Sequence, residues 1–287
     1  RDAVPVIING LKRLEYRGYD AAGVAGLKAG QIEVRRDAGK LSQLIDLVAK
    51  SPIEGAPGIG HTRWATHGAP SARNAHPHLG QTKRVVVVQN GIVENFLEIK
   101  DELTAEGVEF QSETDTETIV HLVEHYLATG IGLVEAARKT FNDIQGANVV
   151  VLMSADEPDK IVTARIGNAG GVVIGMGVGE NFIASDIPAI MEHTREVIFL
   201  ESRQMAVVTR NTVTIETLDG AKVKPQVHTV SWDPVAAEKG EYRHFMQKEI
   251  HEQVRALTDT LAGRVDFAQG RIRLPDLKLT GGLAKRI

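Results

Sequence analysis

The spacing of apolar residues divides the chain into helical segments and short strands. At the start, Asp2 and Pro5 are typical of a helix beginning, and apolar residues at intervals of three or four continue to Leu14. The same periodicity places apolar side chains on one helix face and predicts further amphipathic helices. They cover residues 41–49, 95–107, 116–127, 132–141 and 242–261.

Short runs rich in β-branched residues predict strands in the middle of the chain. They cover residues 149–153, 161–164, 171–174, 182–184, 197–200, 205–209 and 213–216. Earlier strands are predicted at residues 59–63 and 85–88, and a hairpin is predicted between residues 24–27 and 31–35. Because helices flank this strand series instead of alternating with it, the pattern favours an α+β layered sandwich over a doubly wound parallel sheet.

The amino-acid composition limits the kinds of molecule that the protein is expected to bind. The 287 residues are 43% apolar, enough for a substantial core, and the net charge of -4 comes from 33 basic and 37 acidic residues without long runs of one sign. We therefore expect no binding to nucleic acid or to a membrane. No apolar run approaches the ~20 residues that span a bilayer, and the start is not a signal peptide, so a cytoplasmic location is predicted.

The chain has no cysteine, which excludes disulfides, thiolate metal sites and a cysteine nucleophile within these residues, but not a cysteine upstream of them.

Candidate chemistry gathers in the segment from His61 to Gly68, in Gln89-Asn90-Gly91 and at Asp115. Together they offer a guanidinium, a carboxylate and an amide. These groups suit a free α-amino acid, whose carboxylate, ammonium and side-chain acyl oxygen they would bind in turn. No nucleophile accompanies them.

Each of these residues also has a structural interpretation. Most arginines are solvated surface residues, which is the alternative for Arg63. Asn90-Gly91 is the commonest sequence of a tight hairpin turn. Asp115 is well placed to cap the helix predicted from Thr116, a role compatible with binding an ammonium group.

Other kinds of site have weaker support. The spacing of four nearby histidines matches no compact zinc motif, and we predict no metal and no cofactor. They are His61, His67, His76 and His78. The glycine-rich residues 175–180 lack the third glycine of a dinucleotide loop and precede a predicted strand. Ser-His-Asp chemistry stays open, although no Gly-x-Ser-x-Gly sequence occurs.

Several long motifs together resemble the glutamine–fructose-6-phosphate aminotransferases, also called glucosamine-6-phosphate synthases. The motifs cover residues 16–23, 61–68, 74–78, 89–95, 112–117, 179–186 and 242–250. The resemblance implies an N-terminal-nucleophile (Ntn) glutaminase domain, which is a four-layer αββα sandwich, followed by two sugar-phosphate isomerase domains. Purine-pathway amidotransferases share that glutaminase fold with different residues in these motifs.

The resemblance also implies a glutamine-binding set. Arg63 would bind the glutamine carboxylate and Asp115 its ammonium group. Thr66 and His67 would line the pocket, and Trp64 would belong to a loop that closes over glutamine and guards the passage of ammonia.

The catalytic set implied by the resemblance centres on an N-terminal cysteine, whose thiolate attacks the glutamine carboxamide with its own α-amino group as base. The Asn90 side chain and the Gly91 amide would form the oxyanion hole, and Arg17 would lie near the nucleophile. In the family a Cys-Gly-Ile-Val-Gly-like strand carries that cysteine, so we expect this chain to lack the first strand and to be inactive by itself.

An irregular segment, residues 223–234, is a candidate domain boundary. We predict a glutaminase domain over 1–225 and a linker helix with a basic tail over 226–287, leading to an absent isomerase domain. That domain would bind fructose 6-phosphate, and the full protein is expected to be a homodimer. The alternatives are a glutamine-binding regulatory domain without catalysis, and a glutaminase that supplies another acceptor.

Overall fold

A computed structural model describes residues 2–231, 242, 244–261, 264–266 and 271–272. Contacts divide the chain into two compact units, Arg1–Ala236 and Ala237–Ile287. The predicted functional boundary between residues 225 and 226 stays a prediction.

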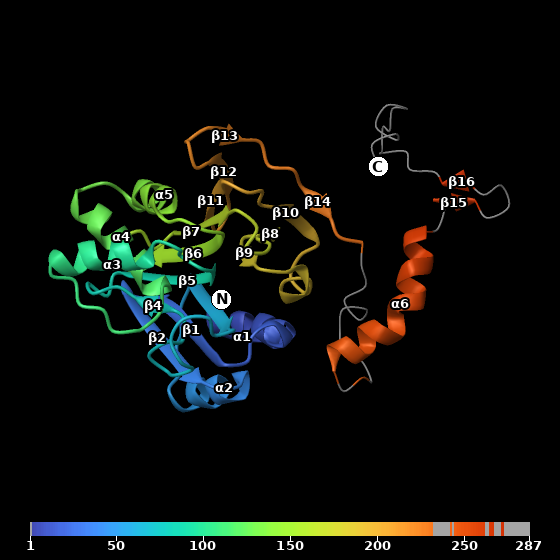
Figure 1. Cartoon of the computed structure of the whole chain (residues 1–287), viewed down its shortest axis with the longest axis horizontal. Helices are drawn as coiled ribbons and strands as arrows, with labels where there is room; N and C mark the ends of the chain where they lie inside the picture. Colours follow the sequence, from blue (N-terminus) through green and yellow to red (C-terminus); the bar gives the residue numbers. More distant parts are fainter. Residues whose placement is uncertain (1, 232–241, 243, 262–263, 267–270, 273–287) are drawn as a thin grey trace. The chain divides into compact units, whose positions relative to one another are not determined.

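Three antiparallel sheets build the first unit (Figure 1). In the smallest, β1 (Ala21–Lys28) lies between β2 (Gln31–Ala38) and β3 (Gly58–Arg63). The largest sheet has the order β13-β12-β11-β7-β6-β5-β4. Its strands are β4 (His78–Leu79), β5 (Val85–Gly91), β6 (Asn148–Ser154), β7 (Lys160–Ile166), β11 (Gln204–Thr209), β12 (Val213–Thr217) and β13 (Lys222–Val223). The third has the order β14-β10-β8-β9 and consists of β8 (Val173–Met176), β9 (Asn181–Ala184), β10 (Glu196–Phe199) and β14 (His228–Thr229).

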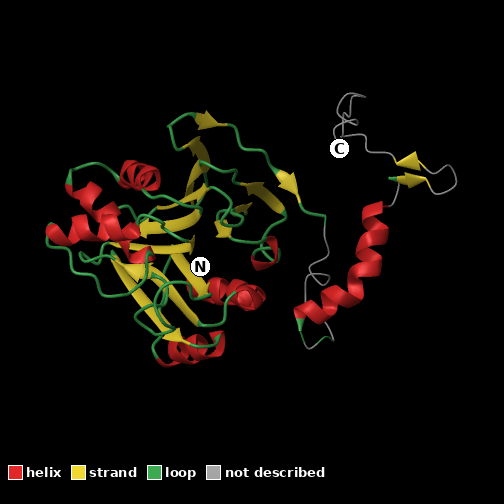
Figure 2. Ribbon diagram, viewed as in Figure 1, coloured by secondary structure: helices red, strands yellow, loops and turns green. Residues whose placement is uncertain are grey.

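Helices of the first unit cover the outer faces of the small and the large sheet (Figure 2). On one side α1 (Ala3–Leu14) and α2 (Leu41–Lys50) pack on the small sheet through a shared apolar cluster with β1. On the other side the large sheet packs against α3 (Phe96–Ala105), α4 (Thr116–Ala128) and α5 (Leu133–Asp143). The predicted α+β fold, a four-layer αββα sandwich, is confirmed.

The four consecutive valines of β5 show why the sandwich needs this sequence. Val85 and Val87 pack against the helices, whereas Val86 and Val88 pack against residues of the small sheet such as Ile59. Because successive side chains of a strand point to opposite faces, a strand between two apolar layers is apolar at every position. The sheet therefore has a core on each face.

Elsewhere the inner layers are completed by the third sheet. Apolar side chains of β11 and β12 pack against those of β8 and β10. The opposite face of the third sheet is covered by the short 3₁₀ helix η2 (Ile187–Ala189) and the residues that follow it. The short strands β4, β13 and β14 were not predicted, since two residues are too few to show a period of two.

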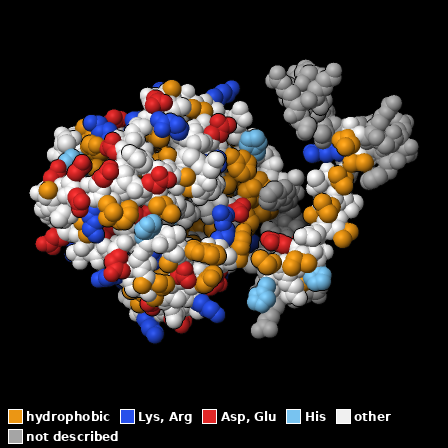
Figure 3. All heavy atoms as spheres, in the orientation of Figure 1, with side chains coloured by type: hydrophobic (Ala, Val, Ile, Leu, Met, Phe, Trp, Pro, Cys, Tyr) orange, Lys and Arg blue, Asp and Glu red, His pale blue; other side chains and the backbone are white. Residues whose placement is uncertain are grey.

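In the second unit, α6 (Phe245–Leu261) corresponds to the predicted long helix, and a small hairpin follows it. The hairpin consists of β15 (Val265–Asp266) and β16 (Arg271–Ile272), in the part predicted to be a basic tail. Hydrophobic side chains along α6 are exposed (Figure 3), namely Met246, Ile250, Val254, Leu257 and Leu261. The tail beyond residue 272 lies outside the described residues. Among the helices that the structure describes, none combines the length and apolar character needed to cross a bilayer.

Candidate active site

A cavity of about 300 Å³ lies where the ends of β3 and β5 meet the start of α4. It collects predicted site residues from four separate parts of the chain. Those that line it are Arg17, Arg63, Trp64, Thr66, Asn90, Gly91 and Asp115. The eighth predicted residue, His67, does not line this cavity, although it lies beside it in the same loop.

Arg63 is the last residue of β3 and is buried, so the interpretation as a solvated surface residue is wrong. Its Nη2 donates to the carbonyl oxygens of His67 and Gly68, the latter at 3.1 Å. Its Nη1 is also buried and has no hydrogen-bond partner among the described residues. Burial lowers the pKa of Arg63, and the charges of Asp115 and Asp20 oppose that shift. The guanidinium is thus held by backbone on one side and offers an unsatisfied donor on the other.

Asp115 stands at the N-cap position of α4, but its side chain makes no capping hydrogen bond. Instead Oδ2 accepts a hydrogen bond from the backbone N–H of Val93 at 2.8 Å. The carboxylate is 3% exposed and shares the cavity with Arg63. The capping interpretation is therefore wrong for this side chain, and the cavity has a fixed anion as well as a fixed cation.

Asn90 and Gly91 do not form a hairpin turn, so that interpretation is wrong too. They are the last residues of β5 and pair with Val149 and Asn148 of β6. Gly91 has a φ of +121°, and a Cβ there would lie 2.1 Å from the carbonyl oxygen of Ala147. Only glycine fits, because the backbone both adopts a left-handed conformation and passes close to a neighbour. The Asn90 Oδ1 lies 2.7 Å from Nε2 of His61.

The segment Arg17-Gly18-Tyr19-Asp20 supports the loop that follows Arg63, a function that its sequence did not reveal. The Asp20 carboxylate accepts a hydrogen bond from the backbone N–H of Ala65 at 2.8 Å. The Tyr19 and Trp64 rings lie 5.6 Å apart. A Cβ at Gly18 would lie 2.5 Å from the carbonyl oxygen of Thr62, so glycine permits this close approach. Trp64 itself is 60% exposed at the cavity.

The far end of the loop is fixed by Asn74. Its Nδ2 donates to the Ala69 carbonyl oxygen and to the Glu113 carboxylate, both at 2.9 Å. Its Oδ1 accepts from the Glu113 backbone N–H at 3.0 Å. Gly68, with a φ of +78°, packs against the same amide. The loop is consequently tied at both ends to elements outside it.

Two predicted residues lie at the margin of the site. Arg17 forms a half-exposed ion pair with Asp186 at 3.2 Å. His67 packs edge-on against the Phe96 ring, with centroids 5.3 Å apart, and its carbonyl oxygen binds Arg63. His67 therefore reaches the site through its backbone.

Three of the four nearby histidines form a stack, and two of them, His61 and His76, line the cavity. The His61 and His76 rings are stacked at 4.5 Å, and His78 meets His76 edge-on at 5.0 Å. Burial lowers the pKa of His61 to about 4 and that of His78 to about 3, so both are neutral near pH 7. Among the described residues, no group of three or more His, Cys, Asp or Glu side chains is arranged to hold a metal ion.

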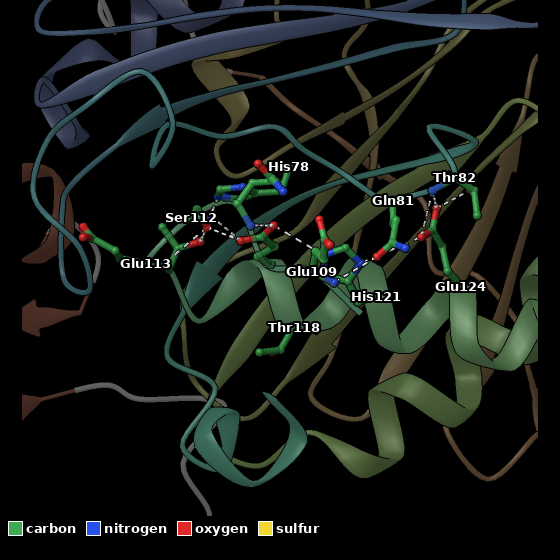
Figure 4. Close-up of polar contacts among 12 residues, drawn as sticks. His78, Gln81, Thr82, Glu109, Ser112, Glu113, Thr118, His121 and Glu124 are labelled. Atoms are coloured by element: carbon green, nitrogen blue, oxygen red, sulfur yellow. Dashed lines mark hydrogen bonds and ion pairs between the residues drawn. The ribbon is translucent and has the colours of Figure 1, made fainter. Parts of the chain in front are cut away.

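A buried polar network continues from this stack into α4 (Figure 4). His78 Nε2 lies 2.9 Å from Thr114 Oγ1, which in turn lies 2.9 Å from Ser112 Oγ. Ser112 donates to Glu117 at 2.6 Å, and His121 lies 3.3 Å from the same carboxylate. Burial raises the pKa of Glu117, but its hydrogen bonds from His121, Ser112 and nearby backbone outweigh this and lower it to about 2.

A larger groove of about 880 Å³ adjoins the cavity. Its lining includes residues 58–62 of β3 and residues 181–185, mostly from β9. Each of these strands is the last in its sheet. The groove shares Arg17, His61 and Asn90 with the small cavity.

Residues 61–191 match a family model described as a glutamine amidotransferase domain. The chain thus contains a glutamine amidotransferase domain. The chain is 47% identical over 280 residues to glutamine–fructose-6-phosphate aminotransferase (isomerizing) of Caldanaerobacter subterraneus subsp. tengcongensis, and 49% identical over 280 residues to that of Symbiobacterium thermophilum. Each alignment covers 98% of this chain and 45% of the relative, so the chain spans about half the length of these proteins. The resemblance stated above is confirmed.

The fold of the first unit is also found in solved structures. One is glutamine phosphoribosylpyrophosphate amidotransferase from B. subtilis, with a TM-score of 0.64 at 22% identity over 75% of this chain and 46% of that one. Another is described as the allosteric regulatory enzyme of purine biosynthesis, with a TM-score of 0.66 at 23% identity over the same shares of the two chains. The expectation that purine-pathway amidotransferases share the fold is confirmed.

Proposed function

We propose that this chain is the glutaminase half of a glutamine–fructose-6-phosphate aminotransferase. It would bind glutamine and release ammonia and glutamate, the ammonia serving the synthesis of glucosamine 6-phosphate. The observation that carries the proposal is the convergence of an unsatisfied Arg63 donor, the Asp115 carboxylate and the Asn90-Gly91 strand end on one cavity of about 300 Å³.

The charges in this cavity suit both ends of a free amino acid. Arg63 Nη1 would donate to the glutamine carboxylate, and Asp115 would accept from its ammonium group. Such charge-assisted hydrogen bonds are strong when water is excluded. Trp64 and Thr66, which line the cavity from the loop, would cover the bound substrate.

The polar end of β5 would then act on the carboxamide. Attack by a thiolate on the carboxamide carbon moves an electron pair onto its oxygen, and the Asn90 amide and the Gly91 N–H would stabilise that charge. The C=O bond then re-forms and the C–N bond breaks, with the nitrogen leaving as ammonia after it takes a proton from the α-amino group of the nucleophile, and water hydrolyses the resulting thioester to glutamate. The residues of this cavity would orient the substrate and stabilise the oxyanion.

The nucleophile would come from outside these 287 residues, because they contain no cysteine. The groove lined by β3 and β9 could accept an extended segment that carries it, since each of these strands is the last in its sheet and could pair with a further strand. Such a segment would reach Arg17 and Asn90, which the groove and the cavity share. Without it we expect no hydrolysis of glutamine.

Arg63→Ala and Asp115→Asn test the binding set in the full protein. We expect either change to raise KM for glutamine about 10- to 100-fold with a smaller effect on kcat, because each removes a charged partner used throughout the reaction. Asparagine at 115 keeps an oxygen for the Val93 N–H, so the fold should be retained. Arg84→Ala, which removes a surface arginine paired with Asp156, is the matched control.

Asn90→Ala tests the oxyanion hole. We expect kcat to fall about 100- to 1,000-fold while KM changes little, since the lost donor acts chiefly on the transition state. Steady-state glutaminase kinetics would measure both constants. A large rise in KM with kcat unchanged would contradict the assignment of Asn90 and Gly91 to the oxyanion.

For the whole protein, the proposal also includes the sugar that accepts the ammonia and the oligomeric state. Fructose 6-phosphate would bind isomerase domains outside this chain, the full protein would be a homodimer, and its location would be the cytoplasm.

Sequencing the N-terminus of the native protein tests whether a cysteine nucleophile is present there. If the mature protein has no cysteine there, the glutamine-binding regulatory domain replaces the enzyme as the better interpretation.

A further inference from the structure

We propose that His61 is a positioning residue that holds the Asn90 amide in the orientation required of an oxyanion donor. The inference rests on the proposed glutaminase function and deepens it. His61 would act through Asn90, not by contact with glutamine.

The hydrogen bond between the two side chains defines their polarity. His61 Nε2 lies 2.7 Å from Asn90 Oδ1, and an amide oxygen can only accept, so Nε2 carries the proton. The Asn90 Nδ2 group, with its two N–H donors, is thereby directed away from His61. If the amide were reversed, Asn90 would present an oxygen to the developing oxyanion and repel it.

The environment of His61 favours one neutral tautomer. Its Nδ1 is buried and has no hydrogen-bond partner among the described residues, so a proton there would have nothing to accept it. Burial lowers the pKa of His61 to about 4, and the positive charge of Arg63 contributes to the lowering. The single proton of the neutral ring therefore belongs on Nε2, facing Asn90.

The plane of the His61 ring is fixed by His76, which stacks on it at 4.5 Å with an interplanar angle of 29°. Thr116 uses its only hydroxyl proton on Gln89 Oε1 at 2.7 Å, so it accepts from His76 Nε2 at 3.1 Å. The Gln89 backbone N–H faces His76 Nδ1 at 3.5 Å, which agrees with that tautomer.

This arrangement links the two halves of the site. Thr116 follows Asp115 directly at the start of α4, so the turn that presents the carboxylate also fixes the histidine stack. The stack in turn orients Asn90 at the end of β5. Displacement of His61 should therefore affect the oxyanion donor before it affects the groups that bind the amino acid.

Nitrogen-15 spectra of histidine in the unmodified full protein test the tautomer directly. We expect the His61 signals, assigned by comparison with His61→Gln, to show a protonated Nε2 and an unprotonated Nδ1 at neutral pH. The reverse tautomer would overturn the proposal, because an unprotonated Nε2 cannot donate to the Asn90 oxygen.

Kinetics test the consequence. We expect His61→Phe to lower kcat for glutamine hydrolysis about 10- to 100-fold and to change KM by no more than about threefold. This loss of kcat is smaller than the loss for Asn90→Ala, because the Asn90 donor is still present but is no longer held in the required orientation. His61→Gln should recover most of the loss, since its side-chain amide can donate to Asn90 Oδ1. His125→Phe, which removes a half-exposed histidine far along α4, is the control and should leave kcat unchanged.

The double variant, which combines His61→Phe with Asn90→Ala, tests whether His61 acts only through Asn90. If His61 acts only through Asn90, His61→Phe should cost nothing more once Asn90→Ala is present. A full kcat in a folded His61→Phe protein, with Asn90→Ala still impaired, overturns this inference alone. If Asn90→Ala itself keeps full kcat, the proposed oxyanion hole fails first. Should His61→Phe not fold, the tautomer of His61 decides the question. A protonated Nε2 supports the proposal, and an unprotonated Nε2 overturns it.

Discussion

Gly91 shows how a single position in this site is constrained in two independent ways. Its φ of +121° is a conformation that side chains disfavour, and a Cβ would lie 2.1 Å from the Ala147 carbonyl oxygen. Gly107 has a similar φ of +92°, but among the described residues other than its chain neighbours none has an atom within 4 Å of its Cβ position. An alanine at Gly107 would therefore cause backbone strain alone, whereas an alanine at Gly91 would cause both backbone strain and a steric clash.

We expect Gly107→Ala to lower the free energy of unfolding by about 1–2 kcal/mol, the usual cost of an unfavourable φ. Gly91→Ala should cost at least about 2 kcal/mol more, because the strand end must move away from β6. Urea unfolding of both variants measures the difference. Equal losses would mean that the close approach to Ala147 relaxes at no cost.

At the scale of elements, the loop after β3 depends on contacts with other segments for its position. Asp20 binds it near Trp64, and Asn74 binds it beyond Gly68. Neither residue lines the cavity. The loop should consequently be sensitive to substitutions that never touch a ligand.

Asp20→Ala is expected to raise KM for glutamine about tenfold, because the Ala65 N–H loses its acceptor and the covering loop is no longer held in place. Asp20→Asn keeps an oxygen acceptor and should stay within about threefold of the unmodified protein. Glutaminase kinetics on the two variants provide the comparison. If the alanine and asparagine variants behave alike, the hydrogen bond to Ala65 is not what positions the loop.

The helices and longer strands could be predicted because their apolar periodicity is local. The run Val85–Val88, for example, is apolar at every position because both of its faces are buried. Family motifs also directed attention to segments that meet in the fold, since seven of the eight predicted site residues line one cavity. Both predictions depend on patterns within short stretches of sequence.

The partners of individual side chains could not be predicted in the same way. Asp115 binds the Val93 N–H and His61 binds Asn90, and each pair is separated by more than 20 positions in the chain. Asn90-Gly91 has the local chemistry of a turn, but pairing with β6 keeps it in a strand. In each case tertiary contacts outweigh the local preference.

At the scale of the molecule, the first unit contains several buried histidines that are neutral near pH 7. The pKa of His61 is lowered to about 4 and that of His78 to about 3, mainly by burial. When unfolded, these rings have an ordinary pKa near 6.5 and take up protons more readily. Their contribution to stability is therefore complete above about pH 6.5 and is lost as the pH falls towards 4.

We expect the free energy of unfolding to decrease steadily between about pH 6.5 and pH 4, by an amount on the order of several kcal/mol. His78→Gln should give a shallower decrease, because glutamine has no proton to gain. Urea unfolding at a series of pH values measures both slopes. Parallel slopes for the two proteins would show that His78 has the same affinity for protons in the folded and unfolded states.

The exposed Trp64 beside the cavity has a practical consequence. The chain contains one other tryptophan, Trp232, which can be replaced by phenylalanine. Trp64 would then be the only indole in this sequence, at the rim of the cavity and 5.6 Å from the Tyr19 ring. Its emission should shift to shorter wavelength when a ligand excludes water from the loop, so the protein contains its own optical probe of occupancy.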